Sequence, residues 1–149
     1  MASVGHVQHG RCEQPSAVTH AAVPTTAAVQ ELRPLVSVRR SGVAAPIRCV
    51  VTSRAELDSI RGRFGQSLNE VPPNVDFSRN LLLIAAMGEQ MNDNYWISID
   101  TVGLSADTTY VVVRSDSPAD GEIVMDMLSS PLVAVLVPRS RTIAFIERD

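Results

Sequence analysis

The stretch NLLLIAAM, residues 80–87, has no polar side chain after its first residue. It is as long as a typical strand and shows no alternation, the pattern of a strand that is buried on both faces. Such a strand needs a neighbour on each side and a covering layer on each face. We therefore expect residues 80–87 to form the central strand of a sheet.

Strand patterns continue outward from this run in both directions. Residues 95–100 alternate apolar with polar side chains, and a turn expected at residues 103–107 separates them from a further strand at 110–114. In residues 47–51, Ile47, Cys49 and Val51 alternate with other residues, which predicts a half-buried strand. The remaining strand candidates are residues 35–38, 123–128, 132–137 and 142–147.

One helix is expected between these strands. Ser53 is a plausible N-cap residue, and Glu56 stands three residues later, as in a capping box. Gly65 lies where a helix commonly ends. The apolar face of this helix would consist of Leu57, Ile60 and Phe64.

A single helix among about seven or eight short strands defines the expected fold class. We predict a mainly β (α+β) domain, an antiparallel sandwich or partly closed barrel with one covering helix. The domain would span residues 33–149, behind an extended N-terminal arm at residues 1–32. The arm has no sustained apolar period and cannot offset its ordering entropy alone, so we expect a partner to order it.

The two cysteines, Cys12 in the arm and Cys49 in an expected strand, leave two interpretations open. They could pair if the arm folded back, or Cys49 could be a small buried apolar residue. The pair therefore indicates no redox compartment by itself. The N-terminus lacks a continuous apolar signal region, and no run is long enough to cross a bilayer.

Charge and composition exclude several functions. The net charge of −3 argues against a nucleic-acid partner, and the absence of lysine excludes Schiff-base and P-loop chemistry. The charge is uneven, with eight Arg against four acids in residues 33–79 and four Arg against ten acids in residues 80–149. This split could orient the domain on a charged partner, or it could reflect two differently solvated faces.

The residue types that usually carry catalysis are missing from the expected domain. All three histidines lie in the arm, so a pre-organised site would lack the usual general base and zinc ligand. His6, His9 and Cys12 would share one face of a helix, but Gly5 and Gly10 argue against that helix, and we expect no metal. We predict no catalytic residues and no cofactor.

The most distinctive candidate for a protein contact is the polar loop that ends in the only adjacent aromatic residues of the chain. Tyr and Trp are common anchors of interfaces because they bury a large area at little entropic cost. Alternatively, one ring fills the core and the other covers an edge. The candidate interaction residues are Gln90, Asn92, Asp93, Asn94, Tyr95 and Trp96.

Residues 75–80 read VDFSRN and lead into the apolar run 81–86 and then Gly88. They resemble the DFS-type turn and strand of the protease complex subunit PrcB C-terminal domain family, and residues 131–138 are similar to its late, proline-bounded strand. The resemblance covers roughly residues 38–145. Where that family has Gly-Gly-Tyr, this chain has DNY at residues 93–95. The resemblance implies a small β domain that accompanies other proteins, typically in extracytoplasmic complexes, with no established catalytic residues.

These observations lead to a functional hypothesis. We expect a non-enzymatic accessory subunit that docks on other protein subunits through its arm and one face of the domain, with a photosynthetic, respiratory or other membrane complex as one candidate assembly. The alternative is a protease regulator or inhibitor that acts through residues 89–96. The localisation is open, and only the family resemblance points to the periplasm or another extracytoplasmic compartment.

Overall fold

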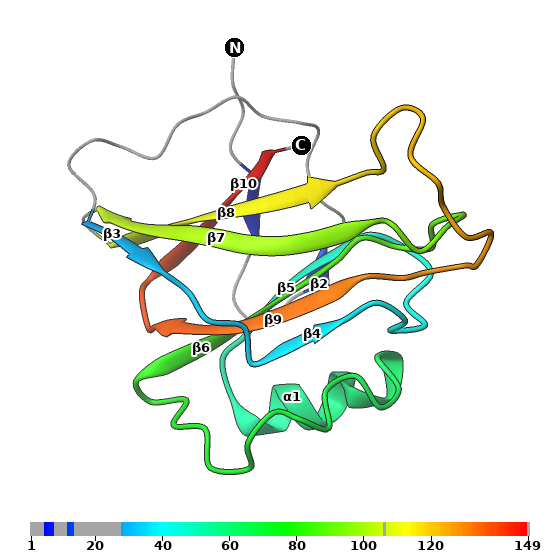
Figure 1. Ribbon diagram of the computed structural model, residues 1–149. Helices are drawn as coiled ribbons and strands as arrows, with labels where there is room; N and C mark the ends of the chain where they lie inside the picture. The colour runs from blue at the N-terminus through cyan, green and yellow to red at the C-terminus, as the bar shows by residue number, and fades with distance from the viewer. Residues whose placement is uncertain (1–4, 8–11, 14–27, 106, 149) are drawn as a thin grey trace.

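The computed structural model describes residues 5–7, 12–13, 28–105 and 107–148. Two β-sheets pack face to face as a sandwich that does not close into a barrel, and one short helix covers the outer face of one sheet (Figure 1). This arrangement confirms the predicted mainly β fold with its single covering helix. Residues 33–149 contribute seven strands, β4 to β10, within the expected number.

Each sheet has five strands in the described part of the chain. Sheet A has the order β1 (Gly5–Val7), β10 (Thr142–Arg148), β8 (Thr108–Asp116), β7 (Trp96–Ser105) and β3 (Ala28–Glu31). Sheet B has the order β2 (Cys12–Glu13), β5 (Ile47–Val51), β6 (Asn80–Ala86), β9 (Leu132–Pro138) and β4 (Val36–Val38).

The described strand pairs are antiparallel with one exception, because β8 and β10 run parallel. The chain leaves sheet A after β8, passes through β9 in sheet B, and then reverses and re-enters sheet A beside β8. Two strands of one sheet that are separated by a strand of the other sheet can point the same way. The sandwich is therefore largely antiparallel, as predicted, with one parallel pair.

The central strand β6 explains the missing alternation of residues 80–87. Leu81, Leu83 and Ala85 pack between the two sheets, against residues such as Val111 and Phe145. The other face of β6 packs on the helical layer, which consists of α1 (Arg54–Ile60), the 3-10 helix η1 (Arg61–Arg63) and the turns that follow. Both faces of β6 are therefore buried, as predicted.

The helix begins at the predicted residue and is stabilised in a slightly different way. The Ser53 side chain accepts a hydrogen bond from the Glu56 amide at 3.1 Å. The Glu56 carboxylate accepts from the amide of Thr52 at 2.6 Å and from its hydroxyl at 2.7 Å, so it caps the residue before the N-cap. The chain tightens into the 3-10 turn η1 around Gly62, and Gly65 follows with φ of +55°.

Strand β5 is buried on both faces, so the predicted half-buried strand is wrong. Alternation placed Arg48 toward solvent, but its side chain is buried beside Glu147 of β10. The guanidinium also donates to the carbonyl oxygens of Ile47 at 2.9 Å and Ala86 at 2.8 Å. A buried arginine is tolerated here because several of its donors have partners.

Two further sequence expectations need correction. Residues 123–128 are not a strand but part of the long connection between β8 and β9, with Ile123 94% exposed. Strands β7 and β8 extend to Ser105 and from Thr108, so the turn between them is shorter than the predicted one at residues 103–107.

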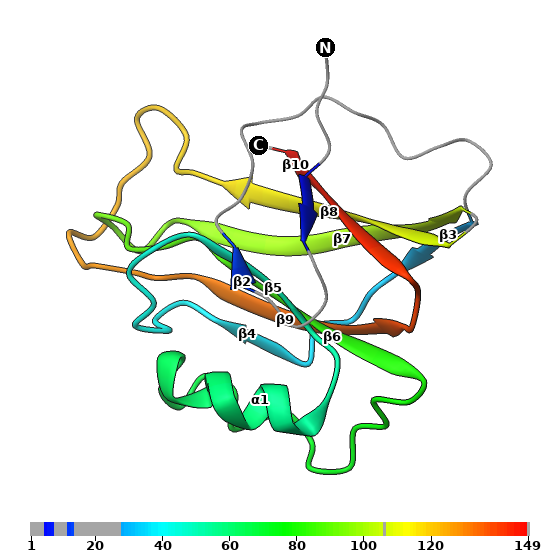
Figure 2. The same ribbon diagram turned by 180° about the vertical axis from the view of Figure 1, so that it is seen from behind.

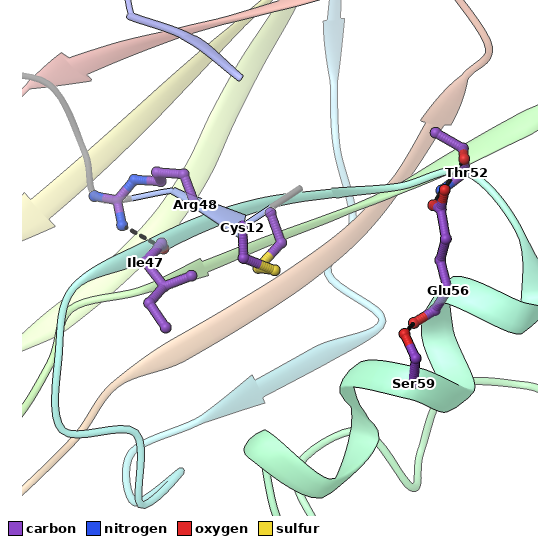
Figure 3. The surroundings of a disulfide bond; sticks show 7 residues. Cys12, Ile47, Arg48, Thr52, Glu56 and Ser59 are labelled. Atoms are coloured by element: carbon purple, nitrogen blue, oxygen red, sulfur yellow. Dashed lines mark hydrogen bonds between the residues drawn. A yellow bond between two sulfur atoms is a disulfide. The ribbon is translucent and has the colours of Figure 1, made fainter. Parts of the chain in front are cut away.

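The described segments of the arm pair with the domain itself. Strand β1 pairs with β10 of sheet A, β2 with β5 of sheet B, and β3 with β7 of sheet A. Figure 2 shows β1 and β2 on the side of the sandwich where β10 and β5 lie. Cys12 and Cys49 form a disulfide, which resolves the pairing that the sequence left open (Figure 3). The domain boundary at residue 32 stays a prediction.

Candidate protein-interaction surface

Three connections meet at one end of the sandwich: residues 39–46 between β4 and β5, residues 87–95 between β6 and β7, and residues 117–131 between β8 and β9 (Figure 1). The predicted interaction residues all lie there. We call residues 89–96 together with residues 116–128 the loop surface. Residues 39–46 support it from the side of sheet B.

Gly88 brings the first part of the loop surface close to its support. Its φ is +80°, and a Cβ atom at this position would lie 2.9 Å from Cδ of Pro46 and 3.1 Å from the carbonyl oxygen of Ala44. The amide of Glu89 donates to that same carbonyl oxygen at 3.0 Å. Glycine is required here because both the backbone conformation and the close approach exclude a side chain.

Gln90 and Ser129 join the two halves of the loop surface. Their backbones exchange two hydrogen bonds, at 2.7 Å and 3.0 Å, and form an isolated antiparallel bridge. The buried Ser129 hydroxyl donates to the carbonyl oxygen of Asn92 at 2.5 Å. The Gln90 side chain donates to the Met87 carbonyl oxygen at 3.2 Å, so its role in the structure is to hold the loop.

The two asparagines of the candidate set also shape the loop. The Asn94 amide donates to the Asn92 side-chain oxygen at 3.0 Å, which is an Asx-turn. The Asn94 side chain donates to the Glu122 carboxylate at 2.9 Å and thereby reaches the second half of the loop surface. Between them, Asp93 is half-buried, and its Oδ1 atom has no hydrogen-bond partner among the described residues.

Neither aromatic ring of the candidate set belongs to the hydrophobic core. Trp96, the first residue of β7, is 45% exposed, and the guanidinium carbon of Arg39 lies 3.8 Å from its ring centroid. This is a cation–π contact, which holds the ring against β4 while one side stays accessible. Tyr95 is half-buried at the margin.

Sequence reasoning missed the apolar residues of the loop surface. Besides Trp96, its exposed large apolar side chains are Met91, Ile123, Met125, Met127 and Leu128. Three of the five methionines of the chain are in this group. Methionine is flexible and polarisable and is frequent on adaptable binding surfaces, so this clustering was the available signal.

The loop surface is also acidic. It contains six carboxylates and no arginine, and all six except Asp93 are exposed: Glu89, Asp93, Asp116, Asp120, Glu122 and Asp126. The supporting residues Arg39 and Arg40 are engaged beside it, with Arg40 in contact with the Met127 sulfur. Apolar side chains between carboxylates characterise a surface that fits a basic, partly apolar partner.

The metal-ligand set that the sequence raised can be compared with the structure. They contain no group of three or more His, Cys, Asp and Glu side chains that could hold a metal ion. Of the proposed His6, His9 and Cys12 ligand set, His9 lies outside the described residues and Cys12 is bonded to Cys49. No helix among the described residues is long and apolar enough to cross a membrane.

The fold and this surface define the class of the protein: a β-sandwich domain with one covering helix and an apolar, acidic surface at one end. Residues 81–138 match the family model described as PrcB C-terminal. This match confirms the resemblance to that family over β6 to β9, including both halves of the loop surface. No curated protein and no solved structure matches the chain.

Proposed function

We propose that this chain is a non-enzymatic accessory subunit that binds another protein through the loop surface. The observation that carries the proposal is the cluster of exposed apolar side chains held between two loops, with Ile123 at 94% and Met91 at 83% exposure. Exposed apolar groups that lie together and are rimmed by polar residues commonly mark protein contacts. The match to the PrcB C-terminal family suggests a subunit associated with a protease complex.

The loops that carry these side chains are held by hydrogen bonds to residues 39–42. Ser130, which is buried, donates its amide to the Arg39 carbonyl oxygen at 2.7 Å, and its hydroxyl accepts from the Gly42 amide at 2.8 Å. The Ser41 hydroxyl donates to the Ser130 carbonyl oxygen at 2.7 Å. Because these contacts exist within the chain, the support of the loop surface is formed before a partner binds, which favours affinity.

The composition of the domain supports a binding role over an enzymatic one. Residues 33–149 contain no histidine, and the whole chain contains no lysine. Among the described residues, the carboxylates of the loop surface are not part of any group of three or more His, Cys, Asp and Glu side chains that could hold a metal ion. We propose that they serve to select a partner by charge.

We assign the arm a smaller part in docking than the sequence suggested. Its described segments use their backbone hydrogen bonds in the domain's own sheets, so we place the partner contact on the loop surface. The disulfide between Cys12 and Cys49 supports an oxidising, extracytoplasmic compartment. We further propose that the partner belongs to a membrane-bound assembly. The identity of the proteins that co-purify with the chain would test this.

Purification from the native source tests the proposal. The full chain with a C-terminal affinity tag should be recovered with a stoichiometric partner, whereas Ile123→Asp with Met125→Asp should be recovered alone at an unchanged Tm. The matched control is Gln66→Asp, an exposed position on the helical layer, which should retain the partner. Recovery of the unaltered chain as a lone monomer would overturn the proposal.

A second candidate function is regulation of a protease by residues 89–96. It is favoured by the family match and by the exposed Trp96 ring beside a fixed loop. Tyr95→Ala with Trp96→Ala should then abolish inhibition of the co-purifying protease. Unchanged inhibition by this variant would show that residues 89–96 do not inhibit the protease.

A further inference from the structure

Residues 123–128, with the sequence IVMDML, have the character of a strand but are not paired as one. The segment is apolar except for Asp126, and it combines β-branched residues with Met and Leu, which fit a pleated surface. Local preference and observed structure usually agree, and the places where they conflict are commonly functional sites. The conflict points to a strand that forms only when a partner is present.

The segment is anchored at both ends. On the N-terminal side, the Glu122 amide donates to the Ala119 carbonyl oxygen at 3.1 Å, and the Glu122 carboxylate accepts from the amides of Ala119 and the Asn94 side chain. On the C-terminal side, Ser129 and Ser130 are buried and bonded to Gln90 and Arg39. The six residues between these anchors therefore span a fixed distance.

The backbone of the segment is available for pairing. Within the described part of the chain, only Met127 of the segment donates its amide to a backbone carbonyl oxygen, that of Met125 at 2.8 Å. Unpaired amides in an exposed, apolar segment resemble an unpaired edge strand. The Met127 amide bonds to the carbonyl oxygen two residues before it, so this turn at Asp126 must open when the segment pairs. Natural edges are usually protected by charges, and Asp126 supplies one in the middle of this segment.

The sheets of the sandwich offer the segment no long edge of their own. Their outermost strands in the described chain are short, three residues in β1 and β4, two in β2 and four in β3. The segment also leads directly into the bridge at Ser129, where the chain enters sheet B. A strand from another molecule is thus the available pairing partner.

The carboxylates identify the chemistry of that partner. Asp120, Glu122 and Asp126 lie in or beside the segment and are exposed, which disfavours the anionic surface of a membrane. They favour a protein edge that carries arginine or lysine beside apolar side chains. The exposed Ile123 and Met125 side chains, which share one face of a strand, would then enter apolar positions of that partner's surface.

We propose that residues 123–128 add as a β-strand to the exposed edge strand of a partner protein whose flanking residues are basic. The inference rests on the proposed accessory function and specifies how the loop surface binds. Main-chain hydrogen bonds would supply affinity, and alternate side chains would supply specificity. Side-chain docking without strand formation is the contrasting mode.

Hydrogen exchange measured by mass spectrometry on the natively purified complex and on the free chain tests the proposal. Amides of residues 123–128 should exchange at least about tenfold more slowly in the complex, because strand pairing protects them. A complex that forms without this protection overturns strand addition but leaves the accessory function standing. Recovery of the chain alone instead contradicts the accessory function itself.

Two variants and two probes complete the test. Met125→Ala keeps the backbone donor and Met125→Pro removes it, so the proline variant should bind the partner at least about tenfold more weakly than the alanine variant. If both variants bound the partner equally weakly, main-chain hydrogen bonding at residue 125 would not contribute to binding, which would contradict strand addition. Flotation with phosphatidylcholine and phosphatidylglycerol vesicles should show no binding, and the purified chain alone should show no protection of these amides. Binding to the vesicles, or protection of the same amides in a dimer of the purified chain, contradicts the proposal.

Discussion

Arg48 of β5 and Glu147 of β10 form an ion pair that joins the two sheets of the sandwich. The Arg48 Nε atom donates to Glu147 Oε1 at 2.9 Å and lies 3.3 Å from Oε2. The Arg48 and Glu147 side chains are only 5% and 12% exposed. The pair lies one residue from the Cys49 disulfide, so the edge of the sandwich that receives β2 is held by charge and by a covalent bond together.

Removal of one member of this pair should be strongly destabilising. Glu147→Ala leaves the Arg48 guanidinium buried without its carboxylate, and we expect the free energy of unfolding to fall by about 3 to 5 kcal/mol. Urea denaturation measures this loss. The control Arg148→Ala, at the exposed neighbouring position, should change stability by less than about 0.5 kcal/mol.

The double replacement Arg48→Met with Glu147→Leu tests whether the fold needs the two charges or only well-packed side chains at these positions. Because apolar residues of similar volume avoid the desolvation of two charges, the double variant should recover most of the stability lost by Glu147→Ala. A double variant as unstable as the single one would show that the other donors of Arg48, to Ile47 and Ala86, matter more than the ion pair.

The disulfide between Cys12 and Cys49 should contribute to stability through the loop that it closes. The two residues are 37 positions apart, and closing a loop of this length typically stabilises a fold by about 2 to 4 kcal/mol. Cys12→Ser should lose this amount in urea denaturation under oxidising conditions. Reductant should lower the stability of the unaltered chain to the same level and leave Cys12→Ser unchanged, and a reductant effect on the variant would contradict the assignment.

Alanine substitutions at three glycines form a graded test of the backbone conformation and close approach at Gly88. Gly88→Ala combines a φ of +80° with contacts of about 3 Å to Pro46 and Ala44, so it should destabilise by more than about 2 kcal/mol. Gly121→Ala has a similar φ of +81° and nothing within 4 Å, so about 1 kcal/mol is expected. Gly62→Ala meets neither constraint and should be neutral or stabilising by up to about 1 kcal/mol. Thermal unfolding in any other order would contradict the close approach at Gly88.

The sequence was sufficient where local chemistry decides the structure. The unbroken apolar run of β6 and the Ser53 cap predicted a doubly covered strand and the start of the helix. The sequence was insufficient where the burial of a side chain depends on a residue that is distant in the sequence. Arg48 is buried because it pairs with Glu147, which is 99 positions later in the sequence. The alternation of residues 47–51 gives no sign of that partner. Residues 123–128 stay unpaired because no long edge is open to them.

The candidate surface was predicted in part for the same reason. Polar residues beside Tyr95 and Trp96 indicated the loop, and the structure places all of them at one end of the sandwich. Met91 and Ile123 could not be assigned to that surface, since exposure depends on which strands find partners. The side chains of Asn92 and Asn94 also shape the loop, a structural role that the sequence did not indicate.

Asp76 should titrate below its ordinary range. Hydrogen bonds from the Ser78 hydroxyl and then the Ser78 amide hold the pKa of this carboxyl below 3.8, with a smaller contribution from Arg79. Because the folded pKa is lower than the unfolded one, the resulting stabilisation is present above 3.8 and is lost as pH falls through the folded pKa. Carboxyl chemical shifts followed by NMR should give a midpoint that rises more in Ser78→Ala than in Arg79→Ala. The reverse order would assign the shift to charge instead.

Asn94 should couple the two halves of the loop surface through Glu122. The Asn94 side chain donates a hydrogen bond of 2.9 Å to the Glu122 carboxylate. Asn94→Gly removes that bond at an exposed site, so global stability should fall by only about 0.5 to 1 kcal/mol. Amides of residues 119–124 should nevertheless exchange faster, because Glu122 loses one of its two anchors while it keeps the Ala119 amide. Glu122→Gln should also speed this exchange, since its single side-chain oxygen can accept from the Asn94 side chain or from the Ala119 amide but not from both. Equal exchange in Asn94→Gly and in the unaltered chain would mean that the N-terminal anchor of residues 123–128 depends on the Ala119 turn alone.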